Sequence, residues 1–151
     1  MTRAALLRAG LLVGLAAAGS AAAAGPTKVS LRAVLELAQA ARSLDGTVRF
    51  VGVGEPQPEA AESFGVDVRY ERTASLLRTP ERSCERVALS ALIALQNNAK
   101  LLGADAVIGL ASRYRGRAAA DPDEIECEIG PFSGQVSLKG TYVRLARQGD
   151  R

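Results

Sequence analysis

The two cysteines are the residues whose chemistry can be predicted most directly. Cys84 and Cys127 are 43 positions apart. Each occupies an apolar position of a predicted helix or strand, so both side chains are expected to point into one core. Two cysteines in an exported protein most often pair, whereas redox-active pairs are usually close in sequence, with at least one sulfur exposed. We predict a structural disulfide, with a redox-active thiol pair as the alternative.

Three glutamates alternate along a predicted strand over 124–129. Glu124, Glu126 and Glu128 share one face of it, and neighbours on that face are about 7 Å apart, too far to chelate a metal tightly by themselves. In a hairpin with the preceding strand they would face alternating arginines, which are Arg113, Arg115 and Arg117. The pattern predicts a solvated charge ladder or, as the alternative, a carboxylate cluster for a metal or for acid–base chemistry.

A pair of asparagines, Asn97 and Asn98, lies inside a predicted helix. Asparagine is a poor helix former, so the pair marks either a recognition surface or simply solvent-facing positions. Together with Glu124, Glu126 and Glu128, these residues are our candidate ligand or partner surface.

Histidine is absent from the chain. Without it there is no Ser–His or Cys–His pair and no histidine-supported metal site. No phosphate-binding G-x-x-x-x-G-K-[ST] motif occurs. Chemistry based on serine with lysine, or on paired carboxylates, stays open, although no spacing points to it. We therefore expect a protein that is not an enzyme and has no cofactor and no bound metal.

The first 24 residues have the pattern of a secretory signal peptide. Arg3 and Arg8 supply the positive charge, residues 11–18 the apolar segment, and Ala22–Ala24 a small-residue cleavage site before Gly25. The apolar segment is about ten residues long, whereas a membrane-spanning helix needs about 20. The pattern predicts a periplasmic or secreted protein with no stable membrane insertion after cleavage.

Removal of the signal peptide changes the charge balance. The full chain has a net charge of +3, and loss of Arg3 and Arg8 leaves 17 basic and 16 acidic residues, a net charge of +1. Such a balance lacks the basic footprint of a nucleic-acid-binding protein. Residues 25–151 are long enough for one domain with a single core.

A long helix over 80–102 is the best-defined predicted element. Thr79 is the expected N-cap, Pro80 suits the first helical position, and Gly103 is the expected C-cap. Its apolar residues recur at spacings of three and four, which predicts one continuous buried face. A second helix is predicted after Ser30 and ends at Asp45-Gly46, with a buried stripe of Leu31, Val34, Leu35, Ala38 and Ala41.

Strands are predicted from β-rich or alternating segments. In 66–72, apolar and charged residues alternate, which indicates a strand with one solvent-facing side. In the last strand the apolar parity changes across Gly140, which predicts a bulge there. The predicted strands cover 47–53, 66–72, 105–114, 124–129 and 135–145, with a flexible terminus over 25–28, an exposed loop over 54–63 and a turn region over 116–123.

Several of these segments resemble a family of small secreted proteobacterial proteins of unknown function, often labelled "excinuclease ATPase subunit". The resemblance covers about 31–145, and its most specific parts are the paired cysteines and the Leu102–Val107 junction. It is carried by the run from Cys84-Glu85-Arg86 through Leu102-Gly103-Ala104-Asp105-Ala106-Val107, followed by Cys127 and by Leu138-Lys139-Gly140-Thr141-Tyr142. The label carries no weight, because the chain lacks the phosphate-binding loops and zinc cysteines of such an ATPase.

The helix, the junction and the closing strands are more distantly similar to two other groups. These are the YbjQ-type family, labelled as heavy-metal binding, and RcsF-like domains, which act in envelope-stress sensing. The resemblance implies an α+β fold in which the long helix packs on a mostly antiparallel sheet, with a short N-terminal helix. It carries over no ligand set, because histidine is missing, and the chain departs from RcsF in having two cysteines and no lipid-attachment cysteine.

We therefore expect an exported, non-enzymatic domain that binds an unknown envelope protein. The alternative is a metal- or small-ligand-binding protein of the YbjQ-like type, and a third option is an enzyme that uses serine, lysine or carboxylates.

Overall fold

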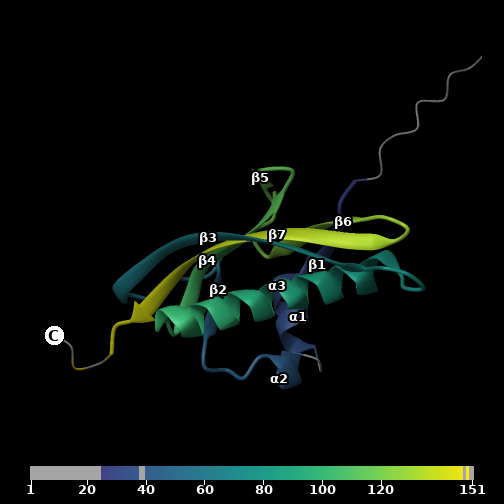
Figure 1. Cartoon of the computed structure of the whole chain (residues 1–151). Helices are drawn as coiled ribbons and strands as arrows, with labels where there is room; N and C mark the ends of the chain where they lie inside the picture. The colour runs from purple at the N-terminus through teal and green to yellow at the C-terminus, as the bar shows by residue number, and fades with distance from the viewer. Residues whose placement is uncertain (1–24, 38–39, 148, 150–151) are drawn as a thin grey trace, which may run out of the picture.

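The chain folds as a mixed α+β structure with one seven-stranded sheet (Figure 1). The computed structural model describes residues 25–37, 40–147 and 149, so the predicted signal peptide and its cleavage residue Ala24 lie outside the described residues. No helix within these ranges is long and apolar enough to cross a membrane. The elements are β1 Thr27–Ser30, α1 Leu31–Glu36, α2 Ala40–Ser43, β2 Arg49–Gly52, β3 Ala60–Ala74, α3 Pro80–Leu102, β4 Ala106–Tyr114, β5 Arg117–Ala118, β6 Glu124–Ile129 and β7 Ser133–Leu145.

Helix α3 begins and ends at the residues predicted for it. The Thr79 hydroxyl accepts a hydrogen bond from the Arg82 backbone N–H, and Pro80 occupies the first turn. Gly103 closes the helix in the left-handed conformation, at φ 75°, where a glycine has no Cβ to clash. The local capping signals are therefore sufficient to define this helix.

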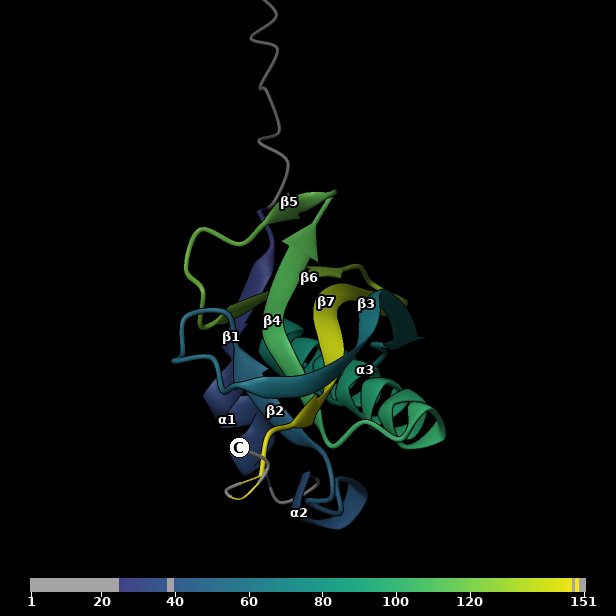
Figure 2. The same cartoon turned by 90° about the vertical axis from the view of Figure 1, so that its left-hand side faces the viewer.

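Strand β7 is the centre of the sheet. β3 pairs with one side of β7 along almost its whole length, and β4 and β6 share the other side. β1 extends the sheet beyond β6 and β2 beyond β4, and the short β5 pairs with β4 (Figure 2). The pairing of β2 with β4 is parallel, while the other pairings found are antiparallel. The prediction of a long helix packed on a mostly antiparallel sheet is thus confirmed in part.

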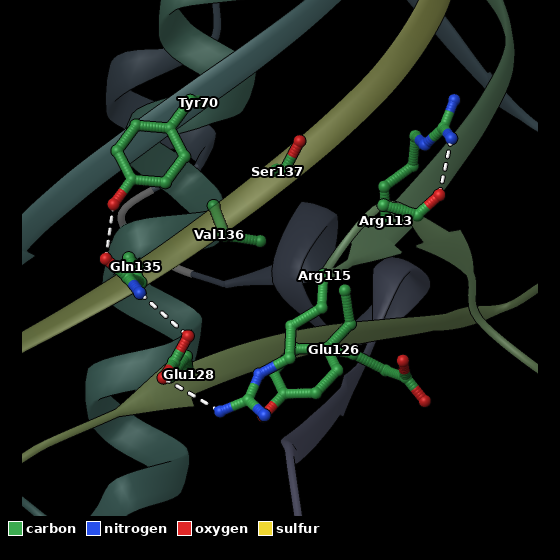
Figure 3. Close-up of a pocket in the computed structure, with 10 residues that line it drawn as sticks. Tyr70, Arg113, Arg115, Glu126, Glu128, Gln135, Val136 and Ser137 are labelled. Atoms are coloured by element: carbon green, nitrogen blue, oxygen red, sulfur yellow. Dashed lines mark hydrogen bonds and ion pairs between the residues drawn. The ribbon is translucent and has the colours of Figure 1, made fainter.

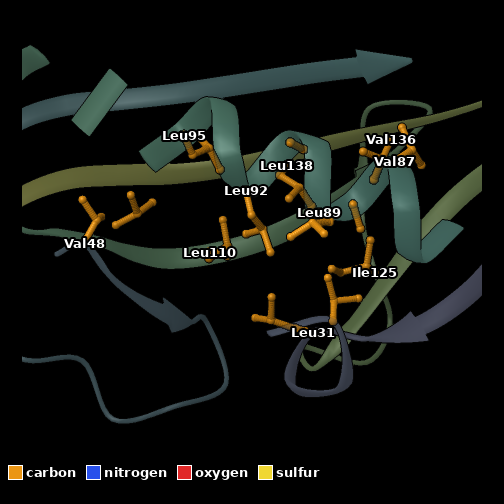
Figure 4. Packing of buried hydrophobic residues seen from close by; sticks show 14 of the residues in the cluster. Leu31, Val48, Val87, Leu89, Leu92, Leu95, Leu110, Ile125, Val136 and Leu138 are labelled. Carbon is orange, nitrogen blue, oxygen red and sulfur yellow. The ribbon is translucent and has the colours of Figure 1, made fainter. Parts of the chain in front are cut away.

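The core fills the space between α3 and one face of the sheet (Figure 4). Leu92 and Leu95 of α3 are fully buried against a layer that includes Leu110 of β4 and Leu138 of β7. Full burial of a side chain of this size contributes about 1.5–3 kcal/mol relative to exposure. The opposite face of the sheet, which α3 does not cover, is called the open face below.

The predicted disulfide is confirmed. Cys84 and Cys127 are bonded, with their Cα atoms 5.5 Å apart and both side chains fully buried. The bond joins the beginning of α3 to β6, so the helix is covalently tied to the sheet it covers.

The N-terminal region differs from the prediction in two respects. Residues 27–30 form β1, which pairs with β6, and are not a flexible terminus. The single helix predicted up to Asp45 is wrong, since α1 stops at Glu36 and α2 follows from Ala40. The break has a backbone cause, because Leu37 is extended at ψ 142°. The predicted stripe positions Ala38 and Ala41 lie outside the residues whose side chains are described.

Two further predictions about the strands are wrong. β3 begins at Ala60, so the predicted exposed loop over 54–63 ends earlier than expected. β7 runs without a bulge through Gly140, and the irregularity lies opposite it in β4, between Ile108 and Ala111. Gly109 takes the positive φ of 60° that this bulge requires. Gly140 is needed for close approach instead, because a Cβ there would lie 2.5 Å from Cγ1 of Val107.

Candidate functional site

The solvent-facing side of β3 carries the apolar residues of its alternating sequence. Val66, Val68 and Tyr70 are 60%, 51% and 57% exposed; these three residues are called the apolar strip. The charged residues between them, Asp67 and Arg69, face the α3 side and are partly buried. Exposed contiguous apolar surface on a domain of this size is typical of an interaction site.

The apolar character continues beyond the end of β3. Leu76 and Leu77 follow the strand, and Phe132 lies beside them, since the Ser75 N–H donates to the Phe132 carbonyl at 3.1 Å. All three side chains are exposed, Leu77 completely. Leu77 also has a positive φ of 62°, a conformation that is uncommon for residues other than glycine. The turn after β3 therefore carries exposed apolar side chains of its own.

A fork in the sheet opens a pocket next to the apolar strip. On the same side of β7, β4 pairs with the part from Leu138 to Val143, and β6 pairs with the part from Gly134 to Val136. β4 and β6 therefore separate from each other at the point between Val136 and Leu138. The buried Ser112 hydroxyl joins them at the fork, because it accepts from the Glu126 N–H at 2.9 Å and donates to the Glu126 carbonyl at 3.4 Å. Beyond this link the space between β4 and β6 is open.

The pocket has a volume of about 330 Å³ and receives side chains from four strands (Figure 3). Tyr70 at the end of the apolar strip forms part of its wall. The other lining residues come from the end of β4 and its turn, from β6 and from β7; they are Arg113, Tyr114, Arg115, Gly116, Glu126, Glu128, Gln135, Val136 and Ser137.

A chain of polar contacts crosses the pocket (Figure 3). The Tyr70 hydroxyl donates to the Gln135 side-chain oxygen, and the Gln135 amide donates to Glu128 at 2.8 Å. Arg115 contacts the same carboxylate at 3.3 Å. The hydrogen bond from Gln135, followed by the contact with Arg115, lowers the pKa of Glu128 from its ordinary value, so Glu128 is a carboxylate at neutral pH. The pocket presents a cationic group and an anionic group to whatever enters it.

The glutamates predicted as a surface lie together on the open face, but their partners differ from those expected. Lys28 of β1 contacts Glu124 at 2.8 Å and Glu126 at 3.6 Å. Arginines were predicted to face these glutamates, and among the described residues one such ion pair forms, between Arg115 and Glu128. No cluster of three or more Asp, Glu, Cys or His side chains suited to a metal ion is found in the part of the chain that the structure describes.

The two predicted asparagines do not form one surface. Asn97 is exposed, whereas Asn98 is turned inward between α3 and β3. Its amide donates to the Tyr142 hydroxyl at 3.0 Å, and that hydroxyl donates to Asp67 at 2.6 Å. Arg69 also contacts Asp67, at 3.1 Å. This polar cluster explains why the charged side of β3 faces the helix, because Asp67 finds its hydrogen-bond partners there.

The cluster shifts the ionisation of both acidic groups. Burial opposes the ionisation of Asp67, but the Tyr142 hydrogen bond and the Arg69 charge outweigh it, and its pKa is lowered from the ordinary 3.8. Burial, together with the neighbouring Asp67 carboxylate, raises the pKa of Tyr142. The ionised Asp67 therefore stabilises the fold above the pKa of an unfolded aspartate, and this contribution is lost as pH falls through the folded-state pKa.

We expect Tyr142→Phe to lower the free energy of unfolding at pH 7 by about 1–2 kcal/mol, because it removes a hydrogen bond to a charged group. The difference from the wild type should shrink as pH falls through the lowered pKa of Asp67, because the protonated carboxyl no longer accepts a charge-assisted bond. Urea unfolding at pH 7 and at a series of lower pH values measures it. A loss independent of pH would show that the Tyr142 hydroxyl acts through its bond with Asn98 and not through the ionised Asp67.

Lys28, Tyr70 and Gln135 belong to this site but were not among the residues predicted for it. The alternation of apolar and charged residues in 66–72 places Tyr70 on the same side of the strand as Val66 and Val68. It does not indicate which side of the strand faces solvent. Lys28 lies in a four-residue strand that is too short to be recognised by its periodicity.

No protein-family model matches this chain, and no curated protein matches it. The function is therefore inferred from the geometry of the site.

Proposed function

We propose that this chain is an exported, non-enzymatic domain that binds a protein partner in the cell envelope through its open face. The observation that carries the proposal is the apolar strip on β3 that leads into the pocket at the fork. An exposed apolar surface next to tyrosine and arginine side chains is the composition found at the centres of protein interfaces.

Location outside the cytoplasm is part of this proposal. The N-terminal pattern of positive charge, apolar segment and small residues supports export. The Cys84–Cys127 disulfide supports it independently, because structural disulfides persist in oxidising compartments such as the periplasm.

The open face offers two kinds of contact to a partner. Val66 and Val68 would bury apolar side chains, and the pocket would accept a polar side chain between Arg115 and Glu128. Burial of a valine contributes about 1.5 kcal/mol, so loss of one strip residue should weaken binding about tenfold.

A photo-crosslinking amino acid at Lys139 tests the proposal. Lys139 is exposed on β7 and is paired with Val68, so it should capture a partner bound to the apolar strip. We expect one adduct of defined mass in intact envelopes from position 139, and none from the exposed Asn97 on α3.

Matched charge substitutions decide whether that adduct depends on the strip. Val68→Glu should reduce its yield about tenfold, whereas Val53→Glu, at a similarly exposed valine in the β2–β3 loop, should leave it unchanged. An adduct that survives Val68→Glu, or equal capture from position 97, would contradict the proposal.

The pocket supports a second candidate, the binding of a small ligand. Its volume of about 330 Å³ lies within the range of small-molecule sites, and Arg115 and Glu128 suit a ligand with both an acidic and a basic group. A thermal shift with a divalent cation or such a small molecule, abolished by Glu128→Gln, would favour this function over the first.

A further inference from the structure

β3 forms an edge of the sheet. It spans Ala60–Ala74 and pairs with β7 on one side, and no other strand in the described ranges pairs with its second side (Figure 2). Edge strands of this length can pair with another chain unless they are protected.

The hydrogen-bonding pattern between β3 and β7 shows which residues of β3 direct their backbone groups toward the free edge. The Ser75 N–H donates to the Phe132 carbonyl, and this pair continues the register of Ala74 with Ser133. In an antiparallel ladder, residues alternate between directing both backbone groups toward the partner strand and directing both away from it. The N–H and C=O groups that face the free edge therefore belong to Val66, Val68, Tyr70, Arg72 and Ala74.

The charges on the inner side of β3 alternate in sign along Asp67, Arg69 and Glu71. Inward charges often protect an edge strand, but alternating signs are complementary to an antiparallel copy of themselves. In a two-fold pairing centred on Val68, Asp67 lies opposite Arg69 of the second copy, and the reverse. A pairing centred on Asp67 or Arg69 would place like charges opposite each other, which is unfavourable.

The apolar strip selects the same centre. In a pairing centred on Val68, Val66 lies opposite Tyr70 of the second copy, and the two copies of Val68 lie opposite each other. The two apolar strips then form one apolar surface. A pairing centred on Tyr70 also satisfies the charges, through Arg69 and Glu71, but it places Val68 opposite Arg72. Only the Val68 centre satisfies charge and apolar contacts together.

Arg69 supplies a further indication. Its guanidinium group contacts Asp67 of the same chain at 3.1 Å, and its side chain is still 34% exposed, so it remains accessible to a second copy. In the pairing about Val68, Arg69 and Asp67 of the second copy form a non-hydrogen-bonded pair, in which side chains are closest. The second copy thus brings a carboxylate next to the guanidinium group.

We propose that the chain forms a two-fold symmetric dimer in which β3 pairs antiparallel with β3 of a second copy, centred on Val68. The two-fold axis is perpendicular to the sheet, so both open faces lie on the same side of the dimer. The proposal goes beyond the proposed function and does not depend on it.

Cysteine crosslinking tests the register. Two copies of Val68→Cys lie directly opposite each other, at a separation that suits a disulfide, whereas two copies of Val66→Cys are four positions apart. Both side chains are exposed, so both variants should fold. Under mild oxidation we expect crosslinked dimer from Val68→Cys and monomer from Val66→Cys. Equal crosslinking of the two variants, or none in Val68→Cys, would overturn the proposed pairing.

Sedimentation equilibrium of the mature protein tests the dimer without crosslinking. We expect a dimer mass for the wild type and a monomer mass for Val68→Pro, which loses the N–H that faces the free edge while the bonds to β7 remain. A monomeric wild type would overturn the dimer and leave the crosslinking at Lys139 unaffected, so the two proposals fail separately.

Discussion

Replacement of Cys84 and Cys127 by alanine is expected to lower the free energy of unfolding by about 4 kcal/mol. The disulfide closes a loop of 43 residues, and its loss returns that conformational freedom to the unfolded chain. The result is measured by urea unfolding of the double variant and the oxidised wild type. The bond is fully buried, so the native protein should also resist mild reductants.

Reduction of the unfolded wild type provides the control for this prediction. Once reduced and refolded without oxidant, the wild-type chain should show nearly the same stability as the double variant. A double variant as stable as the oxidised protein would contradict the expected effect of the bond on the unfolded chain.

The second large effect is expected at Gly140. In Gly140→Val the new Cβ would lie 2.5 Å from Cγ1 of Val107 and 3.4 Å from Cδ1 of Leu110, before the two further carbons are placed. Overpacking of this kind costs about 3 kcal/mol. The loss should appear as a lower urea midpoint with an unchanged slope.

Two variants show whether the close approach is the cause. Gly25→Val should be nearly neutral, because no atom of the residues that the structure describes, chain neighbours apart, lies within 4 Å of a Cβ at that position. Val107→Ala combined with Gly140→Val should recover part of the loss, as contacting residues do in a double-mutant cycle. Additive effects of the two substitutions would contradict the proposed contact.

The features predicted correctly from the sequence are those with local signals. Helix α3 carries a cap residue, a first-turn proline and a terminal glycine within its own sequence, and its limits were predicted to the residue. The disulfide followed from two cysteines at apolar positions. In both cases the segment itself contains the information.

The features that the sequence did not predict depend on distant partners. β1 is a strand because β6 lies beside it, about 100 residues along the chain. The side of β3 that faces α3 is set by Tyr142 and Asn98, which bind Asp67. The bulge lies in β4 because Val107 approaches Gly140. The pocket arises from the separation of β4 and β6, which no single segment encodes.

The position of β7 in the chain has a consequence for biosynthesis. β7 is the central strand, yet it is the last element along the sequence. Before it emerges, β3 has no strand to pair with among those described, and β4 and β6 are not joined through a common neighbour. The pairings of β3, β4 and β6 with β7 therefore form only after residues 133–145 have been made.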